Sequence, residues 1–300
     1  MQTEDLSEYC SPGASYWDER FAISSRITLR LITFTPALET TSIPVIFVAG
    51  WISLIKGWKE VLREMTKDFT VYYVETREKI SSQVKGKVGY GVADIGSDLV
   101  SLVDRLSMQS GRYILMGSSL GATVILESYR SLTKKPRCLV LIAPNAIFRV
   151  PSGWKAVIAV FYPGLYALIR PTVKWYLRTF RLNVDADRAQ YEKYCDALDA
   201  ADPWKLKKAV MSVWSYEVWS SLKSVDCPTL IVNASKDKLH EPEIMKRITA
   251  TLPSAMDIDL ETNARTHSKD VVEAMRSYLA QLPPSVVATP VPPVQLSPKR

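Results

Sequence analysis

Five short apolar runs recur along this chain and constrain its fold more than any other feature. The runs are residues 44–50, 70–74, 113–116, 138–142 and 228–232. Each has the composition of a strand that is buried on both faces of a sheet. Segments with helical spacing of apolar residues lie between the first four runs, at 56–66, 96–106 and 119–129. Because strands that alternate with helices form parallel crossover units, the sequence predicts an α/β fold with a doubly wound, mostly parallel sheet.

The two ends of the chain differ from this pattern. Residues 17–34 contain alternating apolar and polar side chains, which indicate a half-buried strand or hairpin, and residues 1–16 are expected to form a loose leader. Residues 283–300 are rich in proline and are expected to be disordered. The predicted α/β core therefore comprises residues 17–145 and 226–282.

One long segment, residues 146–225, interrupts the alternation of strands and helices. It contains helical patterns at 153–169, 171–181, 186–199 and 203–222, and no strand pattern. Because predicted strands of the sheet precede and follow this segment, we interpret it as a helical cap that is inserted into the α/β core.

Composition places the chain among ordinary globular proteins, since 47% of its 300 residues are hydrophobic and 23% are charged. The four cysteines are widely spaced and form no C-x-x-C pair, so neither a zinc site nor a disulfide framework is expected, and no cofactor is predicted. The first residues lack the basic start and apolar run of a signal peptide, which favours the cytoplasm. The longest apolar run, 156–169, is shorter than the roughly 20 residues that span a bilayer.

A G-x-S-x-G motif follows directly after the predicted strand at 113–116. It runs from Gly117 to Gly121 and has Ser119 at its centre. A serine on a sharp turn between a strand and a helix exposes its hydroxyl, and small residues on either side let neighbouring backbone approach. The same pentapeptide also fits an ordinary tight turn, but the strand before it and the helical pattern after it favour a nucleophile.

A serine nucleophile needs a base, and the chain contains two histidines. His267 lies between the predicted strand 256–260 and the predicted helix 268–281. His240 directly precedes the predicted helix 241–251, and this position favours a surface or capping role. Asp237 follows the strand at 228–232 and is the candidate acid that would orient the imidazole. Both Asp237 and His267 also fit simple loop roles, and Glu241 is a weaker alternative acid.

An acyl-transfer site also needs N–H donors for the oxyanion. The backbone amide of Leu120, which directly follows the candidate nucleophile, is the first predicted donor. The amide of Trp51 is the second, because Gly50-Trp51 ends the apolar run at 44–50. Gly50 equally fits an ordinary loop glycine.

From residue 17 to residue 282 the chain resembles the α/β-hydrolase fold superfamily, as a serine hydrolase with a helical cap. The resemblance rests on Gly50-Trp51, the 117–121 motif, Asp237 and His267, in the order nucleophile, acid, base. Residues 75–77 resemble a degraded form of the family's Asp-x-Arg-Gly stretch. Ala49 stands where the family often has His, and Thr266 where a Gly is common. These departures concern the substrate class and the loop geometry more than the fold.

The composition of the cap leaves its role open between substrate binding, packing and surface contact. Seven aromatic residues would line a pocket for an apolar substrate or pack onto the core: Trp154, Phe161, Tyr162, Tyr166, Trp175, Tyr176 and Phe180. Lys174, Arg178 and Arg181 suit a weak contact with an anionic membrane surface, an acidic substrate such as an acyl-CoA, or a solvated face. No long basic run or zinc motif is present, so nucleic-acid binding is not expected.

These features predict a serine hydrolase that cleaves an ester-like bond in a largely apolar small molecule. Ser119 would attack the carbonyl, His267 would transfer the proton, and Asp237 would hold the imidazole. Two alternatives stay open. The same triad could cleave a thioester or a carbon–carbon bond, or the chain could be a catalytically idle homologue that binds a ligand or a partner.

Overall fold

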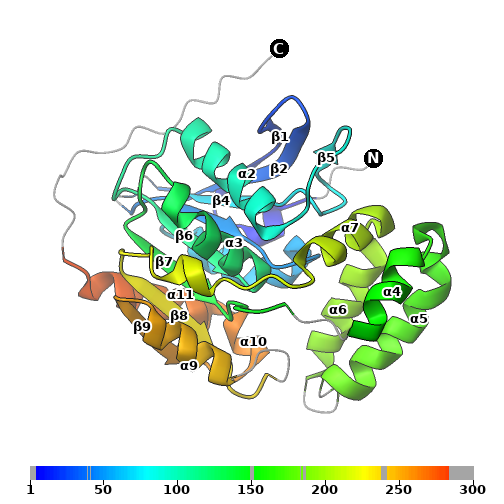
Figure 1. Ribbon diagram of the computed structural model, residues 1–300. Coiled ribbons are helices and arrows are strands. Elements are labelled where there is room, and N and C mark those ends of the chain that lie inside the picture. Colours follow the sequence, from blue (N-terminus) through cyan, green and yellow to red (C-terminus); the bar gives the residue numbers. More distant parts are fainter. Residues whose placement is uncertain are drawn as a thin grey trace.

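The computed structural model describes residues 5–38, 40, 42–148, 152–182, 184, 187–237 and 242–283. A sheet forms the centre of the molecule, and helices cover both of its faces (Figure 1). Most of the predicted C-terminal tail, residues 284–300, lies outside the described residues, as do His240 and Glu241.

The strands of the sheet follow the spatial order β1-β2-β4-β3-β6-β7-β8-β9, with β5 paired to β2. Their bounds are β1 Ser15–Ala22, β2 Ile27–Thr35, β3 Val45–Val48, β4 Val71–Glu75, β5 Gln83–Val84, β6 Ile114–Ser118, β7 Cys138–Ile142, β8 Thr229–Asn233 and β9 Ala255–Asp259. Pairing is parallel from β4 through β9 and antiparallel where β2 meets β1, β4 and β5. The predicted mostly parallel sheet is confirmed, and the segment at 17–34 is the predicted hairpin at its edge.

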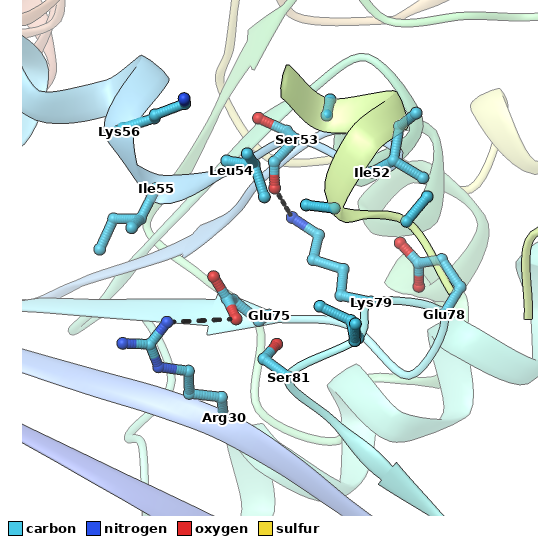
Figure 2. Close-up of a pocket in the computed structure, with 14 residues that line it drawn as sticks. Arg30, Ile52, Ser53, Leu54, Ile55, Lys56, Glu75, Glu78, Lys79 and Ser81 are labelled. Atoms are coloured by element: carbon cyan, nitrogen blue, oxygen red, sulfur yellow. Dashed lines mark hydrogen bonds and ion pairs between the residues drawn. The ribbon is translucent and has the colours of Figure 1, made fainter. Parts of the chain in front are cut away.

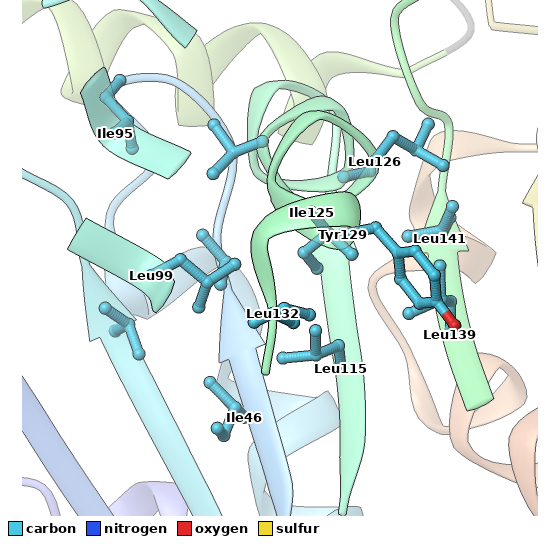
Figure 3. Close-up of a cluster of buried hydrophobic side chains, with 14 of the residues drawn as sticks. Ile46, Ile95, Leu99, Leu115, Ile125, Leu126, Tyr129, Leu132, Leu139 and Leu141 are labelled. Carbon is cyan, nitrogen blue, oxygen red and sulfur yellow. The ribbon is translucent and has the colours of Figure 1, made fainter. Parts of the chain in front are cut away.

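Two separate hydrophobic clusters cover the two faces of the sheet, because successive residues on a strand point to opposite sides. Ile46 and Leu115 belong to the cluster under α2 (Val92–Arg105) and α3 (Leu120–Ser128), which Figure 3 shows. Their chain neighbours, Phe47 and Met116, belong to the cluster under α1 (Lys59–Met65) and α11 (Lys269–Gln281). This division makes the sheet doubly wound, as predicted.

The predicted helices of the core form close to their expected bounds. In α2 the helix begins four residues earlier than the 96–106 pattern, because Asp94 Oδ2 accepts a hydrogen bond of 2.9 Å from the amide of Gly91 and caps the first turn. The short 3₁₀ helix η2 (Ile55–Trp58) precedes α1, and α9 spans Pro242–Thr251. Two short elements, β5 and the four-residue helix α10 (Asn263–Thr266), were not expected from the sequence.

The N-terminal segment corrects one expectation, since residues 5–16 are not a loose leader. Leu6 and Tyr9 are buried in the same cluster as α1 and α11, and Tyr9 ends the 3₁₀ helix η1 (Ser7–Tyr9). Ser11 is fastened to Thr66 by two hydrogen bonds of 2.8 Å, one through its amide and one through its hydroxyl. The apolar side chains and these two bonds hold the segment against α1.

The inserted segment is helical, as predicted. Its elements are α4 Ser152–Val160, η4 Pro163–Leu165, α5 Tyr166–Tyr176, the π-helical η5 Leu177–Arg181, α6 Arg188–Ala200, α7 Pro203–Val213 and α8 Trp219–Leu222. The apolar run at 156–169 is divided into two helices where Pro163 opens η4. Among the described residues, no helix has the length and hydropathy that crossing a membrane requires. In Figure 1 the helices α4 to α7 lie together at one side of the sheet.

Candidate active site

Ser119 lies on the sharp turn between β6 and α3, with φ 50° and ψ −117°. This left-handed backbone is rare for a residue with a side chain, and it lifts the hydroxyl away from the end of the strand. The glycines on either side are required by packing. A Cβ on Gly117 would lie 2.8 Å from the nitrogen of Ala122, and a Cβ on Gly121 would lie 2.1 Å from the carbonyl oxygen of Val48. The turn therefore has the geometry of a nucleophile elbow.

The loop after β3 passes directly against this turn. A Cβ on Gly50 would lie 3.3 Å from the Cβ of Ser119, so the Gly50-Trp51 loop and the elbow are in contact. The strand order brings them together, because the chain leaves β3 toward one face of the sheet and leaves the neighbouring β6 toward the other. A crevice at the carboxyl ends of the strands is expected at such a switch point.

Leu120 is the first residue of α3, so its amide is one of the N–H groups at the helix start that have no partner within the helix. The amide therefore lies beside the hydroxyl of Ser119, where a donor for an oxyanion is needed. Trp51 follows Gly50 in the loop that touches Ser119, and its buried indole nitrogen has no hydrogen-bond partner among the described residues.

Asn145 is the hydrogen-bond partner of the serine hydroxyl. Its Nδ2 donates to Ser119 Oγ at 2.9 Å, and its own carbonyl accepts a bond of 2.7 Å from the hydroxyl of Thr123. Asn145 follows β7, the strand next to β6. This contact could not be predicted from the sequence, because Asn145 and Ser119 are 26 positions apart.

His267 lies at the junction of α10 and α11, where its ring stacks on Trp58 at a centroid distance of 4.1 Å. Its Nδ1 lies 2.9 Å from the carbonyl oxygen of Asn263, which can only accept a hydrogen bond. Its Nε2 lies 3.2 Å from the Nζ of Lys193, a donor when protonated. These partners favour the tautomer with the proton on Nδ1 and a lone pair on Nε2, which is the form that a general base requires.

Asp237 is buried after β8 and is held by two amide side chains. Gln190 Nε2 donates to Oδ1 at 3.3 Å, and Asn263 Nδ2 donates to Oδ2 at 3.4 Å. Asn263 thus contacts both the candidate acid and, through its carbonyl, the candidate base. This link could not be read from the sequence, because Asn263 and His267 both lie between the predicted strand 256–260 and the predicted helix 268–281, where no helix was expected.

A chain of contacts connects the serine side of the site to the histidine side. Gly50 touches Ser119, its carbonyl accepts a bond of 3.2 Å from the amide of Ser53, and Ser53 Oγ accepts a bond of 2.9 Å from the indole of Trp58, which stacks on His267. All these groups lie at the carboxyl edge of the sheet. In the described part of the chain Ser119 Oγ is bonded to Asn145 and not to His267, so the direct triad bond stays a prediction.

The cap contributes two side chains to this region, both from α6. Gln190 reaches Asp237, and Lys193 donates to Asn263 Oδ1 at 2.7 Å while its Nζ faces His267. Burial lowers the pKa of Lys193 to about 8, against attraction from Asp237 and Asp187. The sequence carried no motif for these cap residues, because their partners are more than 45 positions away.

A cavity of about 200 Å³ lies beside the segment that follows Gly50-Trp51. It is lined by the loops after β3 and β4 and by the end of α6, at 52–56, 75–81 and 197–201 (Figure 2). Lys79 crosses it and donates to the carbonyl of Ser53 at 2.8 Å, and burial lowers the pKa of Lys79 and raises that of Glu78. The cavity is therefore partly polar, and no aromatic residue of the cap is among the described residues that line it.

The stretch at 75–77, which resembles a degraded family motif, has a structural role. Arg77 forms a buried ion pair with Asp98, with its Nε 2.7 Å from Oδ2, and also donates to the carbonyls of Gly89 and Asp94. This guanidinium fastens the loop after β4 to the start of α2.

The family model for the alpha/beta hydrolase family matches residues 45–281, which include the elbow, the Gly50-Trp51 loop and both candidate partners. The chain belongs to the alpha/beta hydrolase family. No curated protein sequence matches it.

Solved structures share the fold of this alpha/beta hydrolase at low sequence identity. A hydrolase from Pseudomonas aeruginosa PA01 superposes with a TM-score of 0.71 at 19% identity, covering 87% of this chain and 96% of the other. A thermophilic esterase from Thermogutta terrifontis superposes with a TM-score of 0.68 at 19% identity, covering 89% of this chain and 98% of the other. A bromoperoxidase from Bacillus anthracis superposes with a TM-score of 0.68 at 18% identity, covering 89% of this chain and 100% of the other. Because these neighbours carry different activities, the likeness establishes the fold and not the substrate.

Proposed function

We propose that this protein is a serine hydrolase that cleaves an ester-like bond in a largely apolar small molecule through an acyl-enzyme on Ser119. The observation that carries the proposal is the left-handed backbone of Ser119 between two glycines that packing requires. A strained turn of this kind persists only where the surrounding structure enforces it, and such strain is concentrated at functional sites.

In the proposed reaction Ser119 Oγ attacks the substrate carbonyl while His267 Nε2 accepts the hydroxyl proton. Asp237 stabilises the imidazolium, and the amides of Leu120 and Trp51 stabilise the tetrahedral oxyanion. His267 then returns the proton to the leaving group, and water hydrolyses the acyl-enzyme by the same steps. The Nδ1 contact with Asn263 supports this role, because it favours a lone pair on Nε2.

The proposed reaction requires a rearrangement of His267. The imidazole has to turn its Nε2 from Lys193 toward Ser119, and Ser119 Oγ already holds a donor in Asn145. As the proton leaves, this donor stabilises the negative charge that develops on Oγ. Asn145 is thus a catalytic residue in the proposed site, because it contacts the reacting oxygen directly.

The decisive experiment combines esterase assays with covalent labelling by a fluorophosphonate. The Ser119→Ala variant should lose activity on short acyl esters by roughly three orders of magnitude or more and should not be labelled. Ser101→Ala is the matched control, since this half-buried serine lies on α2 and its hydroxyl donates to the carbonyl of Ser97, one turn earlier in the same helix. Full esterase activity in Ser119→Ala would overturn the proposal. A panel of esters, thioesters and C–C substrates separates the three bond types that one triad could cleave.

One observation favours a second candidate function, a catalytically idle homologue that binds a ligand or partner. Ser119 Oγ and His267 Nε2 each have another polar neighbour, Asn145 and Lys193. If wild-type protein is not labelled by the fluorophosphonate at any pH between 6 and 9, where imidazole loses its proton, the idle function is supported.

A further inference from the structure

The cap carries most of the large apolar side chains that this protein exposes to solvent. Ten of the fifteen exposed large hydrophobic residues among the described residues belong to it, although the cap is about a quarter of the chain. We call these ten residues the outer cap face: Val157, Val160, Tyr162, Leu165, Leu168, Ile169, Trp175, Tyr176, Phe180 and Trp204. An exposed apolar surface of this kind marks an interaction site in a soluble fold.

The helix α5 is oriented opposite to an ordinary surface helix. Its polar side chains at 166, 170 and 174 point to α6, where the Tyr166 hydroxyl donates to the carbonyl of Leu198 and the two cations pair with Asp199. Its apolar side chains face solvent instead, and Leu168 is 75% exposed. A surface helix normally buries its apolar face, so the orientation of α5 leaves that face available to a partner.

The neighbouring helix α4 shows the same exposure. Val160, at its end, is 85% exposed, and the Lys207 ammonium of α7 donates to the carbonyls of residues 159 and 161 on either side of it. Figure 1 shows α4 and α5 on the side of the cap that lies away from the sheet. The contacts with α6 and α7 therefore fix the two helices from the inner side and leave the outer side uncovered.

The charge of this segment identifies the kind of partner. Residues 152–182 contain five basic residues and no acidic residue. Two of the cations, Arg170 and Lys174, are engaged with Asp199, whereas Arg178 and Arg181 are exposed beside Phe180. Trp and Tyr side chains among apolar residues with flanking Arg are typical of helices that lie in the interface of an anionic membrane.

We propose that the outer cap face docks onto the surface of an anionic lipid bilayer. The apolar side chains of α4 and α5 enter the boundary between head groups and acyl chains, and Arg178 and Arg181 contact lipid phosphates. The helices have 9 and 11 residues, so they lie on the bilayer rather than cross it. A two-fold contact with a second copy fits less well, because the two facing segments 152–182 would each carry basic residues and no acidic residue to pair with them.

The test is flotation of the full-length protein with phosphatidylcholine vesicles that contain or lack phosphatidylglycerol. Wild-type protein should float with the anionic vesicles and lose binding as salt increases. Leu168→Asp should weaken binding at least about tenfold, because it removes an apolar contact and adds a repelled charge. Leu38→Asp is the matched control, since Leu38 is 81% exposed but lies outside the cap, and it should bind as wild type.

A second pair of variants separates charge from apolar contact. Arg178→Gln should weaken binding to anionic vesicles about fivefold, which is the contribution of one basic residue near such a surface. Arg26→Gln, exposed at the hairpin between β1 and β2, should have no effect. Failure of the wild type to float, or equal binding by Leu168→Asp, would overturn the proposal. A wild-type dimer that Leu168→Asp converts to a monomer, without vesicle binding, would also overturn it. Vesicle binding does not depend on Ser119, so the proposed activity stands or fails separately.

Discussion

The sheet and the cap use apolar residues in opposite ways. In the sheet, β3, β6 and β7 are buried along their whole length, and each face has its own hydrophobic cluster. In the cap, comparable side chains on α4 and α5 face solvent, while ion pairs and capping contacts hold the helices to their neighbours. The hydrophobic content of a segment therefore does not by itself reveal which of its side chains are buried. Burial in the sheet produces stability, whereas exposure in the cap leaves surface available for binding.

The largest expected difference between the two regions concerns truncation of a leucine. Leu115 on β6 is fully buried, so Leu115→Ala should lower the free energy of unfolding by about 2–5 kcal/mol, through lost burial and a residual cavity. Leu168→Ala on α5 should change it by less than about 0.5 kcal/mol. Urea denaturation of both variants measures the difference. Equal losses would show that the outer cap face is packed in solution and would contradict the comparison.

A smaller effect is expected from adding one methyl group to a glycine in each region. In Gly121→Ala the new Cβ would meet the backbone of Val48, so unfolding should require about 1–3 kcal/mol less. In Gly153→Ala, on α4, the Cβ would have no neighbour within 4 Å, and the variant should gain about 0.5–1 kcal/mol from better helix propensity. Thermal unfolding of the two variants gives the sign of each change in stability directly. A stabilised Gly121→Ala would show that α3 does not approach β3 as closely as the structure has it.

The third prediction concerns pH at the contact between the two regions. The pKa of Lys193 is lowered to about 8, so between about pH 8 and its ordinary value the unfolded chain binds more protons than the folded chain. The contribution of Lys193 to stability should therefore rise with pH across this window. Other groups titrate in this window too. The readout is therefore the difference in the free energy of unfolding between wild type and Lys193→Met, measured by urea denaturation at several pH values.

If that difference does not change between pH 7.5 and 9.5, Lys193 is not buried against α10 as the structure has it. Arg188→Met, on the exposed side of the same helix, is the control and should show no such dependence.

Much of the fold could be predicted because the information was local. The runs that became β3, β4, β6, β7 and β8 are apolar without interruption, and a strand buried on both faces has few other ways to satisfy such a run. The leader was mispredicted because the contacts that order it are distant. Ser11 is held by Thr66, and Leu6 packs in a cluster whose members extend as far along the chain as Tyr278. A local pattern records neither contact.

The residues of the candidate site also divide into those that a local sequence pattern predicts and those that it does not. Ser119 and its two glycines follow from one pentapeptide, since the backbone that the turn needs is encoded within five residues. Asn145, Trp58, Gln190 and Lys193 could not be predicted, because each is an ordinary residue type that gains its place only when separate segments meet. The roles of Asp237 and His267 stay predictions, supported by their shared contact with Asn263.

The parallel sheet, the tight serine turn and the helical insertion follow from local sequence patterns, because periodicity and turn chemistry act over a few residues. The groups that surround that serine, and the face of α5 that points outward, are set by the packed fold. Both depend on contacts between positions far apart in the chain, such as Tyr166 with Leu198 and Ser119 with Asn145. The free energy of such contacts exists only once the packed layers have brought the partners together.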